Sequence, residues 1–429
     1  MVAASTTGLA LDPELPHRDR LLDAAAMRGT LSTVLGRDAA FALRSCSIVR
    51  TNYRVGRSMR AVYRAEVDGE TYTIAARMFG GTPSAANIRR SLPPARAIGP
   101  LRAVAFEPAL DAVFFVFPTD RRIASLEIVL APATQVPGVR GRSAVGKRLA
   151  AYAPEKSATL ACERADGTAV AYAKVTAALQ AERDHRTYTS LRAALDPRNR
   201  MLRLPRPIAY SDVHRTLWLE AIEGRRMSES DGDDEIGDLA RLGAAVATFH
   251  DLDAPEAPVF TRFAPDRLAG DAAIVRAIRP DASSAVDHLV ERLTARAVAD
   301  RETACLHGDL HAKNAIVCAD RIALIDVEDV ARGPASADIG SLVASLVYRR
   351  ETGGLPAAAC AARIGAFLAG YDAVRRLPSR ASLAWHSAAA LLMERASRAI
   401  TRIRPLGLEH LPALLSAAER LLDRGVEAQ

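Results

Sequence analysis

Two short β-prone runs, 315–318 and 321–325, constrain the fold of this chain most strongly because only two residues separate them. This pattern predicts a tight antiparallel hairpin. In that register Asn314 lies opposite residue 325 or 326, so Asp326 ends its strand beside Asn314. The hairpin therefore brings two side-chain oxygen donors together, and oxygen is the ligand that a hard cation such as magnesium prefers.

A third polar group precedes the hairpin. Asp309 lies five residues before Asn314, in the segment HGDLHAKN at 307–314, on the loop that enters the first strand. An Asp, an Asn five residues later and an Asp at the end of the next strand form the pattern of a kinase catalytic loop and its metal-binding Asp. The alternative is a solvated, Asp-rich turn without chemistry.

The form HGDxxxxN followed by IDxED resembles the aminoglycoside phosphotransferase and choline kinase-like family, small-molecule relatives of protein kinases. The resemblance covers about 144–429 and is strongest from 301 to 345. It implies that Asp309 orients and deprotonates the attacking hydroxyl. It also implies that Asn314 and Asp326 hold magnesium in front of ATP.

Two further positions follow from the same resemblance. His307 opens the HGD segment, and Asp338 lies in GPASADIG a short distance downstream. Both match family positions that brace the catalytic loop, so we expect structural support from them and not chemistry.

Lysine is nearly excluded from this chain, which has four lysines against 53 arginines. Lys174 lies in the apolar run VAYAKV at 170–175. In so arginine-rich a chain, this position indicates a need for a compact ammonium group that a forked guanidinium would not meet. We therefore predict that Lys174 pairs with nucleotide phosphates; the alternative is a surface lysine at a strand end.

The segment after Lys174 is predicted to be a helix that carries an acidic partner. Asp184, Tyr188, Leu191 and Leu195 recur on one helical face, which turns Asp184 inward. A buried carboxylate needs a cationic neighbour, and Lys174 is the expected one. The family usually has Glu at this point, so Glu182 remains an alternative to Asp184.

Nucleotide binding is predicted on both sides of this helix. The segment 202–227 resembles the family's last strands and hinge, which implies that adenine binds backbone groups near Glu220 and Ile222. The loop 152–161 lacks the GxGxxG of protein kinases, so its backbone amides cannot close on phosphate in the glycine-permitted way. Lys156 and Ser157 are the residues that we expect to compensate.

A segment in the first third of the chain has a sequence pattern similar to that of this region. Residues 51–79 and 150–175 each contain a Tyr-led loop and an Asp-Gly pair, at 68–69 and 166–167, which favours type I′ hairpin turns.

The two copies differ at the lysine position. Counted from the glycine, Ala76 stands where the second copy has Lys174. Arg77 would need a one-residue slip, which reverses the facing of its side chain. We interpret the first copy as degenerate and non-catalytic, a platform or homodimer surface; two unrelated meanders are the alternative.

Three units are expected. Residues 1–143 form an N-terminal α+β unit, 144–222 a kinase-like N-lobe and 223–429 a helical C-lobe, with a boundary in the Pro- and Gly-rich stretch 132–141. The fold class is thus α+β, a protein-kinase-like two-lobed fold with an additional N-terminal unit.

Composition narrows the function classes. The net charge is +7, but the arginines are spread along the chain, aromatic content is 5%, and no nucleic-acid-binding motif occurs, so a nucleic-acid partner is not expected. Five scattered cysteines argue against a disulfide framework. Without an apolar run of about 18 residues or a signal-like start, we expect no membrane span and a cytoplasmic protein.

The stretch 383–405 is predicted to be a long helix that packs on the catalytic core. Glu394, Arg398 and Arg402 recur every four residues, which suits either the wall of an acceptor pocket or ion pairing on a solvated face. Trp385 and His386 could contact a substrate or be buried by packing.

The sequence predicts transfer of the γ-phosphate of ATP, with magnesium, to a hydroxyl of a small molecule such as a sugar, an aminosugar or aminoglycoside, or an amino alcohol. Glu328 and Asp329 are candidates for receiving substrate amino groups. The alternative is a catalytically inactive nucleotide-binding regulatory module. A protein kinase is disfavoured because only eleven residues separate Asp326 from Asp338.

Overall fold

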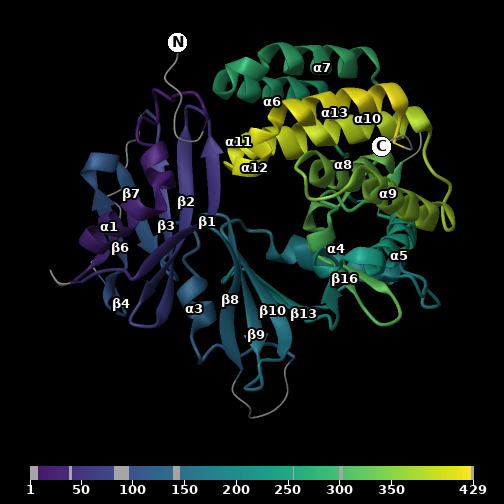
Figure 1. Cartoon of the computed structure of the whole chain (residues 1–429). Helices are drawn as coiled ribbons and strands as arrows, with labels where there is room; N and C mark the ends of the chain where they lie inside the picture. The colour runs from purple at the N-terminus through teal and green to yellow at the C-terminus, as the bar shows by residue number, and fades with distance from the viewer. Residues whose placement is uncertain are drawn as a thin grey trace.

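The computed structural model of the chain describes residues 8–37, 41–81, 96–138, 145–254, 256–298 and 303–426. The predicted boundary between residues 143 and 144 lies outside this part. Figure 1 shows two sheets at the left and bottom, and helices at the right and top.

The first sheet has the strand order β1-β2-β3-β7-β6. Its strands are β1 (Ser45–Arg54), β2 (Ser58–Val67), β3 (Glu70–Phe79), β6 (Val104–Glu107) and β7 (Ala112–Val116). Helix α1 (Ala24–Leu35) precedes this sheet and the short α3 (Leu126–Leu130) follows it. Two small strands, β4 (Ala97–Ile98) and β5 (Leu101–Arg102), form a separate pair.

The second sheet has the order β8-β9-β10-β13-β12. Its strands are β8 (Gly146–Ala153), β9 (Ser157–Glu163), β10 (Ala169–Thr176), β12 (Pro207–Ser211) and β13 (Thr216–Glu220), with helix α4 (Ala181–Ala194) after β10. In both sheets the first three strands form an antiparallel meander. The last strand in sequence pairs with the third, and the fourth strand lies outside it at the edge of the sheet. Duplication of one lobe would produce this shared topology.

The turn after the first strand is held in the same way in both sheets. In the first, Asp12 Oδ2 accepts hydrogen bonds from the Tyr53 hydroxyl at 2.6 Å and from the Gly56 backbone N–H at 2.8 Å. In the second, Asp120 Oδ2 accepts them from the Tyr152 hydroxyl at 2.6 Å and from the Glu155 N–H at 2.9 Å. This repeated clamp is a second feature that supports duplication.

The two Asp-Gly turns differ. Asp68 and Gly69 have φ values of 49° and 82°, as a type I′ turn requires. In the other hairpin only Gly167 has a positive φ, 82°, and its N–H donates to Arg164 O, so the loop is longer than two residues. The type I′ prediction is therefore confirmed for the first turn and wrong for the second.

Successive side chains along the strands of the first sheet point alternately into two apolar cores. Val62 and Ala75 belong to a core that joins the first sheet to the second, whereas their neighbours Ala61 and Ala76 belong to the large core that includes the helices. Ala76 is buried where the second sheet has Lys174. A lysine at position 76 would therefore face packed apolar groups and no cleft.

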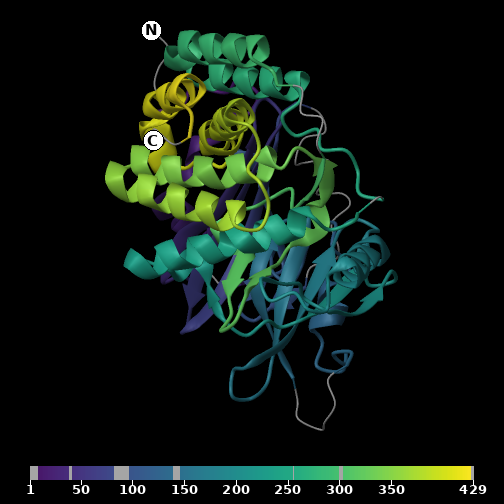
Figure 2. The same cartoon turned by 90° about the vertical axis from the view of Figure 1, so that its right-hand side faces the viewer.

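Most of the remaining chain is helical, and Figure 2 shows these helices stacked above the strands of the second sheet. They are α5 (Gly232–His250), α6 (Pro265–Ile278), α7 (Ser283–Ala295), α8 (Ser336–Glu351), α9 (Ala357–Asp372), α10 (Arg380–Ala390), α11 (Ser397–Thr401), α12 (Pro405–Glu409) and α13 (Leu411–Arg424). A π-helical turn, Leu391–Ala396, joins α10 to α11 and makes the predicted long helix continuous.

Two small sheets position the predicted catalytic segment. One contains β11 (Leu202–Arg203), β17 (Ile322–Leu324), β16 (Ala315–Val317) and β14 (Arg225–Arg226) in that order. The other pairs β15 (Ala304–Leu306) with β18 (Ala331–Gly333). No helix in the described ranges is both long and apolar enough to cross a bilayer.

A buried ion cluster joins the first sheet to the turn between β8 and β9. Glu155 in that turn forms ion pairs with Arg60 and Arg121, both at 2.7 Å, and with Arg77 at 3.6 Å. Burial alone would raise the pKa of Glu155, but the three arginines hold it below its usual range. Arg77 thus faces the second sheet, opposite to the side that Ala76 faces.

We predict that Glu155→Gln lowers the free energy of unfolding by about 3 kcal/mol at pH 7, because it leaves buried arginines unpaired. The control Glu163→Gln removes the more exposed pair with Arg148 and should cost at most about 1 kcal/mol. Since the folded-state pKa of Glu155 is depressed, its contribution is present above the ordinary Glu pKa and is lost as the pH falls. Urea denaturation between pH 4 and pH 7 measures the stability losses of the two variants and their pH dependence. Equal losses in Glu155→Gln and Glu163→Gln would contradict the stabilising role of Glu155.

Candidate active site

The predicted hairpin is present. Strands β16 and β17 pair antiparallel with Ala315 opposite Leu324, and the Ile325 N–H donates to Asn314 O at 2.9 Å. Asn314 therefore lies opposite Ile325, as expected. Asp326 follows with a left-handed backbone, φ 65°, so its carboxylate leaves the strand direction where the hairpin ends.

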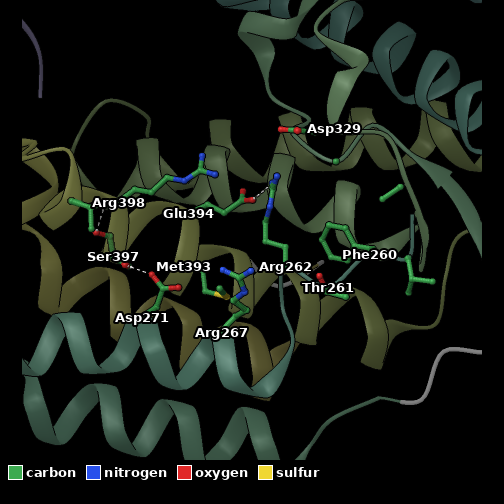
Figure 3. Close-up of a pocket in the computed structure, with 14 residues that line it drawn as sticks. Phe260, Thr261, Arg262, Arg267, Asp271, Asp329, Met393, Glu394, Ser397 and Arg398 are labelled. Atoms are coloured by element: carbon green, nitrogen blue, oxygen red, sulfur yellow. Dashed lines mark hydrogen bonds and ion pairs between the residues drawn. The ribbon is translucent and has the colours of Figure 1, made fainter. Parts of the chain in front are cut away.

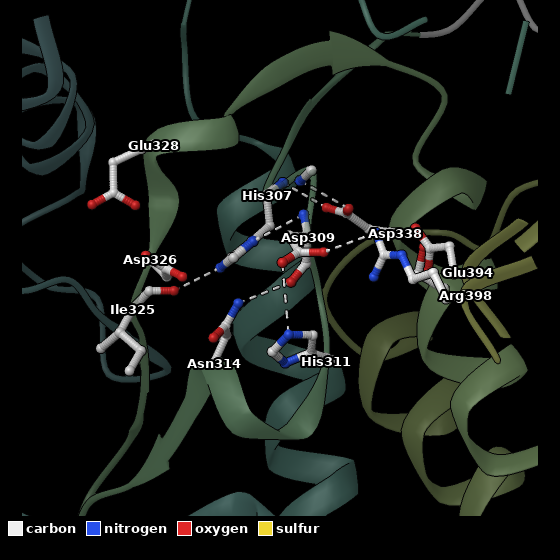
Figure 4. Close-up of polar contacts among 12 residues, drawn as sticks. His307, Asp309, His311, Asn314, Ile325, Asp326, Glu328, Asp338, Glu394 and Arg398 are labelled. Atoms are coloured by element: carbon white, nitrogen blue, oxygen red, sulfur yellow. Dashed lines mark hydrogen bonds and ion pairs between the residues drawn. The ribbon is translucent and has the colours of Figure 1, made fainter. Parts of the chain in front are cut away.

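Asp338 holds the loop that precedes the hairpin. Its carboxylate accepts hydrogen bonds from the backbone N–H groups of His307, at 2.6 Å, and Gly308, at 3.1 Å, and contacts His250 Nε2 at 3.2 Å. Burial alone would raise the pKa of Asp338, but the His250 contact and the His307 N–H hold it below its usual range. The His307 ring Nε2 in turn contacts Ile325 O at 2.9 Å, which joins the loop to the hairpin (Figure 4).

Gly308 is required by both space and backbone conformation. Its φ is 79°, and a Cβ at this position would lie 2.1 Å from the carbonyl oxygen of Asp329. The close approach keeps the catalytic loop against the segment that follows Asp326.

Lys174 points from β10 toward this hairpin. Its Nζ forms an ion pair with Asp326 Oδ1 and a second one with Glu328 Oε2, at 2.9 Å. Burial alone would lower the pKa of Lys174, but Glu328 and Asp326 outweigh it and raise that pKa. The pKa of Glu328 rises mainly through burial, while Lys174 outweighs partial burial at Asp326 and lowers its pKa.

The expected pairing of Lys174 with Asp184 is wrong. Asp184 is buried on the inner face of α4, as predicted, but its carboxylate pairs with Arg183 and accepts a hydrogen bond from Gln180, each at 3.1 Å. The alternative, Glu182, is exposed. Glu328, two residues after Asp326, is closer to the amine than any residue of α4 and takes the role of acidic partner.

This pairing also corrects the role expected of Glu328. Its side chain is only 8% exposed and is engaged by Lys174, so Glu328 is not available to receive a substrate amino group. Glu328 and Asp329 both line the cleft, and Asp329 also lines the adjoining pocket, so its contact with a substrate amino group stays a prediction.

Asp309 lies beside two arginines and a histidine. Its carboxylate lies 3.6 Å from Arg262 Nη1, 3.8 Å from Arg398 Nη2 and 3.6 Å from His311 Nε2. Asn314 Nδ2 donates to the backbone oxygen of Asp309 at 3.0 Å, which turns the amide oxygen of Asn314 away from the loop (Figure 4). The carboxylate is thus held at the wall of the cleft by side chains from separate segments.

The polar stripe of the C-terminal helix faces this site and is not a solvated face. Glu394 is buried and forms an ion pair with Arg262 at 2.8 Å, and no pair between Glu394 and Arg398 occurs (Figure 3). Met393, Glu394 and Arg398 line a pocket of about 440 Å³ beside Asp329. The alternative of ion pairing on a solvated face is therefore wrong.

Trp385 and His386 are buried by packing. Trp385 Nε1 donates to Leu293 O at 2.8 Å, and His386 Nδ1 lies 3.0 Å from Ser336 Oγ. Neither residue lines the cleft or the pocket beside Asp329.

The turn between β8 and β9 lies over the cleft but offers few donors. The Glu155 N–H is bound by Asp120, and the Lys156 N–H donates to Ala153 O at 2.9 Å. The side chains of Lys156 and Ser157 line the cleft. These contacts give a physical reason why the loop would rely on side chains for phosphate binding.

The predicted hinge residues lie apart from Lys174. Glu220 ends β13, and its side chain lies between Arg203, at 3.4 Å, and Arg206, at 3.7 Å, in a different pocket. Neither Glu220 nor Ile222 lines the cleft that contains Lys174. Glu220 nevertheless lies opposite Ala171 in the pairing of β13 with β10, the strand that carries Lys174, so adenine binding by backbone groups near Glu220 and Ile222 stays a prediction.

The other predicted residues meet in one cleft. Lys174, Ser157, Asp309 and Asp326 line a cavity of about 650 Å³ between the second sheet and the helical part. Asn314 is buried just behind Asp309.

The donor set fits a magnesium ion. In the described residues no group of three or more His, Cys, Asp and Glu side chains has the arrangement of a metal site. Asn314 and Asp326 offer oxygen ligands, and the ammonium group of Lys174 already balances the charge of Asp326. Magnesium commonly takes one or two protein ligands and fills its remaining positions with water and phosphate oxygens. Two such donors are therefore sufficient.

Comparison with known proteins identifies the domain. The model of the phosphotransferase enzyme family matches residues 166–377, which contain Lys174, the catalytic loop and Asp338. This part of the chain is a protein-kinase-like phosphotransferase domain. Residues 166–377 thus belong to the phosphotransferase enzyme family. No curated protein sequence matches it significantly.

Several solved structures are similar at low identity. Amicoumacin kinase hAmiN, in complex with AMP-PNP, Ca²⁺ and Ami, is 14% identical, with 72% of this chain and 95% of that one covered and a TM-score of 0.48. The macrolide 2′-phosphotransferase MphH from Brachybacterium faecium is 17% identical, with 70% and 97% covered and a TM-score of 0.41. The streptomycin–ATP–APH(2″)-IIa complex is 14% identical, with 64% and 93% covered and a TM-score of 0.43.

Sequence reasoning missed the cationic neighbours of Asp309 and the true partner of Lys174. Arg262 lies in an irregular segment before α6, where no periodic pattern marks it. Glu328 did carry a signal, since it stands in the IDxED motif two residues after Asp326. The Asp120 clamp was also missed, because a contact across 35 residues leaves no local pattern.

The close fit at Gly308 predicts that Gly308→Ala destabilises the protein by about 2–4 kcal/mol, from backbone strain plus the clash with Asp329. Gly353 is the matched control: its φ is 76°, but nothing lies within 4 Å of a Cβ there. Gly353→Ala should cost only about 1–2 kcal/mol. Chemical denaturation measures both, and equal losses would show that the contact with Asp329 is unimportant.

Proposed function

We propose that this protein transfers the γ-phosphate of ATP to a hydroxyl group of a small molecule in a magnesium-dependent reaction. Asp309 accepts the hydroxyl proton and aligns the oxygen for attack. Lys174 binds nucleotide phosphate, with Lys156 and Ser157 above it. The family assignment supports phosphotransfer, and the nucleotide, the metal and the acceptor class are the proposed part.

One observation carries the proposal. Asp309, Asp326 and Lys174 come from three separate segments and line the same cleft, where Lys174 and Asp326 are in direct contact. A solvated Asp-rich turn would not recruit a lysine from a strand 152 residues away. Phosphoryl transfer needs mainly positioning and charge neutralisation, and this cleft supplies both.

Each polar residue has a separate task in this proposal. Asn314 and Asp326 would hold magnesium, which when bound neutralises the charge that develops on phosphate oxygens. Arg262, Arg398 and His311 keep the Asp309 carboxylate in place. Asp338 and His307 fix the loop backbone, so that the position of Asp309 is set before substrates bind.

We propose the same division into units as the sequence suggests. Residues 1–143 act as a platform for the nucleotide loop, since Glu155 is held by Arg60 and Arg77 of the first sheet. Residues 144–222 form the N-lobe and 223–429 the C-lobe. Formation of a homodimer through the platform remains a prediction.

The catalytic role predicts that Asp309→Asn lowers kcat by at least about a hundredfold, because a general base contributes roughly 10²–10⁴. Binding of AMP-PNP should stay within about twofold of the wild type. Asp287→Asn, an exposed carboxylate on α7, is the control and should leave both unchanged. ATP consumption is measured with sugars, aminoglycosides and amino alcohols as acceptors, and AMP-PNP affinity by calorimetry.

Two results would contradict the proposal. Normal turnover in Asp309→Asn would remove the assigned base. Tight binding of AMP-PNP without ATP consumption for any acceptor would favour the second candidate, an inactive nucleotide-binding regulatory module. That candidate has less support, because Asp309, Asn314 and Asp326 are all present.

A further inference from the structure

Three arginines at one end of the cleft have no acidic partner among the described residues. Arg50 lies on β1, Arg402 follows the last residue of α11, and Arg404 comes two residues later; all three line the cleft. None of their side chains forms an ion pair or hydrogen bond with any residue in the described ranges. In Figure 1 the first sheet meets α11 and α12 at this place. We call these residues the arginine cluster.

The chain holds the arginine cluster together in spite of its charge. The Thr51 hydroxyl, next to Arg50, donates a hydrogen bond to the backbone oxygen of Arg402. Arg402 Nη1 is buried and has no hydrogen-bond partner in the described part of the chain. Burial, together with the nearby Arg50, Arg398 and Arg404, lowers the pKa of Arg402 to about 10. A buried donor without a partner costs free energy, so a ligand that supplies acceptors is the simplest compensation.

Neighbouring acids do not compensate the cluster. A cavity of about 360 Å³ adjoins the cleft and shares Arg50 and Arg402 with it. It is lined by six basic residues and one acid, Glu155, and that acid already pairs with Arg60, Arg77 and Arg121. The basic residues are Arg50, Arg54, Arg60, Arg122, Lys156 and Arg402.

The helix end does not balance the charge either. Arg402 and Arg404 lie at the C-terminus of the continuous helical stretch 380–401, where the helix dipole favours cations. The partial charge there is only about half an elementary charge. Three guanidinium groups therefore leave a large positive excess, which suits a dianion.

The position of the cluster assigns this dianion to the acceptor. Arg398 contacts Asp309 and lines the pocket beside Asp329, and Arg402 lies one helical turn further along the same helix. One turn spans about 5.4 Å, which is the scale of a small sugar or polyol. The nucleotide phosphates have Lys174 on another wall of the cleft.

We infer that the acceptor is a small hydroxylated molecule that already carries a phosphate group, which Arg50, Arg402 and Arg404 bind while its hydroxyl faces Asp309. This inference rests on the proposed function. In the reaction, the bond between the γ-phosphorus and its bridging oxygen breaks, a bond from the γ-phosphorus to the acceptor oxygen forms, and the hydroxyl proton passes to Asp309. The products are ADP and a bisphosphorylated molecule.

The first experiment uses inorganic phosphate as the probe and the full chain saturated with AMP-PNP and Mg²⁺. Calorimetry should detect phosphate binding that weakens with salt. Arg402→Gln should weaken it at least about tenfold, since a hydrogen bond to a charged group is lost. Arg50→Gln tests the same site from another element. Arg64→Gln, an exposed arginine on β2, is the charge-matched control and should bind phosphate as the wild type does.

Three outcomes would overturn the inference. The first is absence of phosphate binding to the saturated wild type. The second is an equal loss in Arg64→Gln, which would indicate a general charge effect. The third is loss of AMP-PNP affinity in Arg402→Gln or Arg50→Gln, which would assign the cluster to the nucleotide. Melting temperatures of the variants identify any that fail to fold, and the remaining variant then decides.

A second experiment separates this inference from the proposed function. Glycerol and glycerol 3-phosphate, and glucose and glucose 6-phosphate, are compared as acceptors. We expect a KM at least about tenfold lower for the phosphorylated member of a pair, and Arg402→Gln should remove this preference without changing the KM for ATP. Transfer with a preference for neutral acceptors would contradict the inference alone. Phosphate binding without transfer to any acceptor would contradict the proposed function alone.

Discussion

The contact between Lys174 and the two carboxylates of Asp326 and Glu328 is the interaction on which the site depends. It ties a strand of the second sheet to the segment that ends the hairpin. The ammonium group is half-buried and the two carboxylates would repel each other without it, so removing Lys174 leaves both of them uncompensated.

The N-terminal unit adds a second constraint. Its sheet repeats the topology of the N-lobe, and Asp12 and Asp120 make the same two hydrogen bonds to equivalent turns. The first sheet has Ala76 buried among apolar residues where the second has Lys174, so that position packs in one sheet and lines the cleft in the other. Glu155 then joins the copies and fixes the turn that covers the cleft.

Local patterns predicted the hairpin, the inward face of α4 and the two meanders, because each rests on periodicity or turn chemistry within about twenty residues. The partners of charged groups were harder to predict from the sequence. Asp184 is turned inward as its helical spacing indicates, but it pairs with the adjacent Arg183, whereas Lys174 meets Asp326 and Glu328 from far away in sequence. The same limit applies to Arg262 and Arg398, which reach Asp309 from segments far away in sequence. The Asp166-Gly167 turn differs from Asp68-Gly69 although the dipeptides are identical, because the loop around it is longer.

The central claim is that Asn314 and Asp326 hold a divalent ion against nucleotide phosphate within the same cleft as Lys174. Electron paramagnetic resonance of Mn²⁺ in the presence of AMP-PNP tests it most directly, since Mn²⁺ takes the same oxygen ligands as magnesium. We predict that nucleotide-dependent Mn²⁺ binding is lost in Asp326→Asn and retained in Asp320→Asn, which changes an exposed carboxylate at the tip of the same hairpin. Unchanged Mn²⁺ binding in Asp326→Asn would contradict the account.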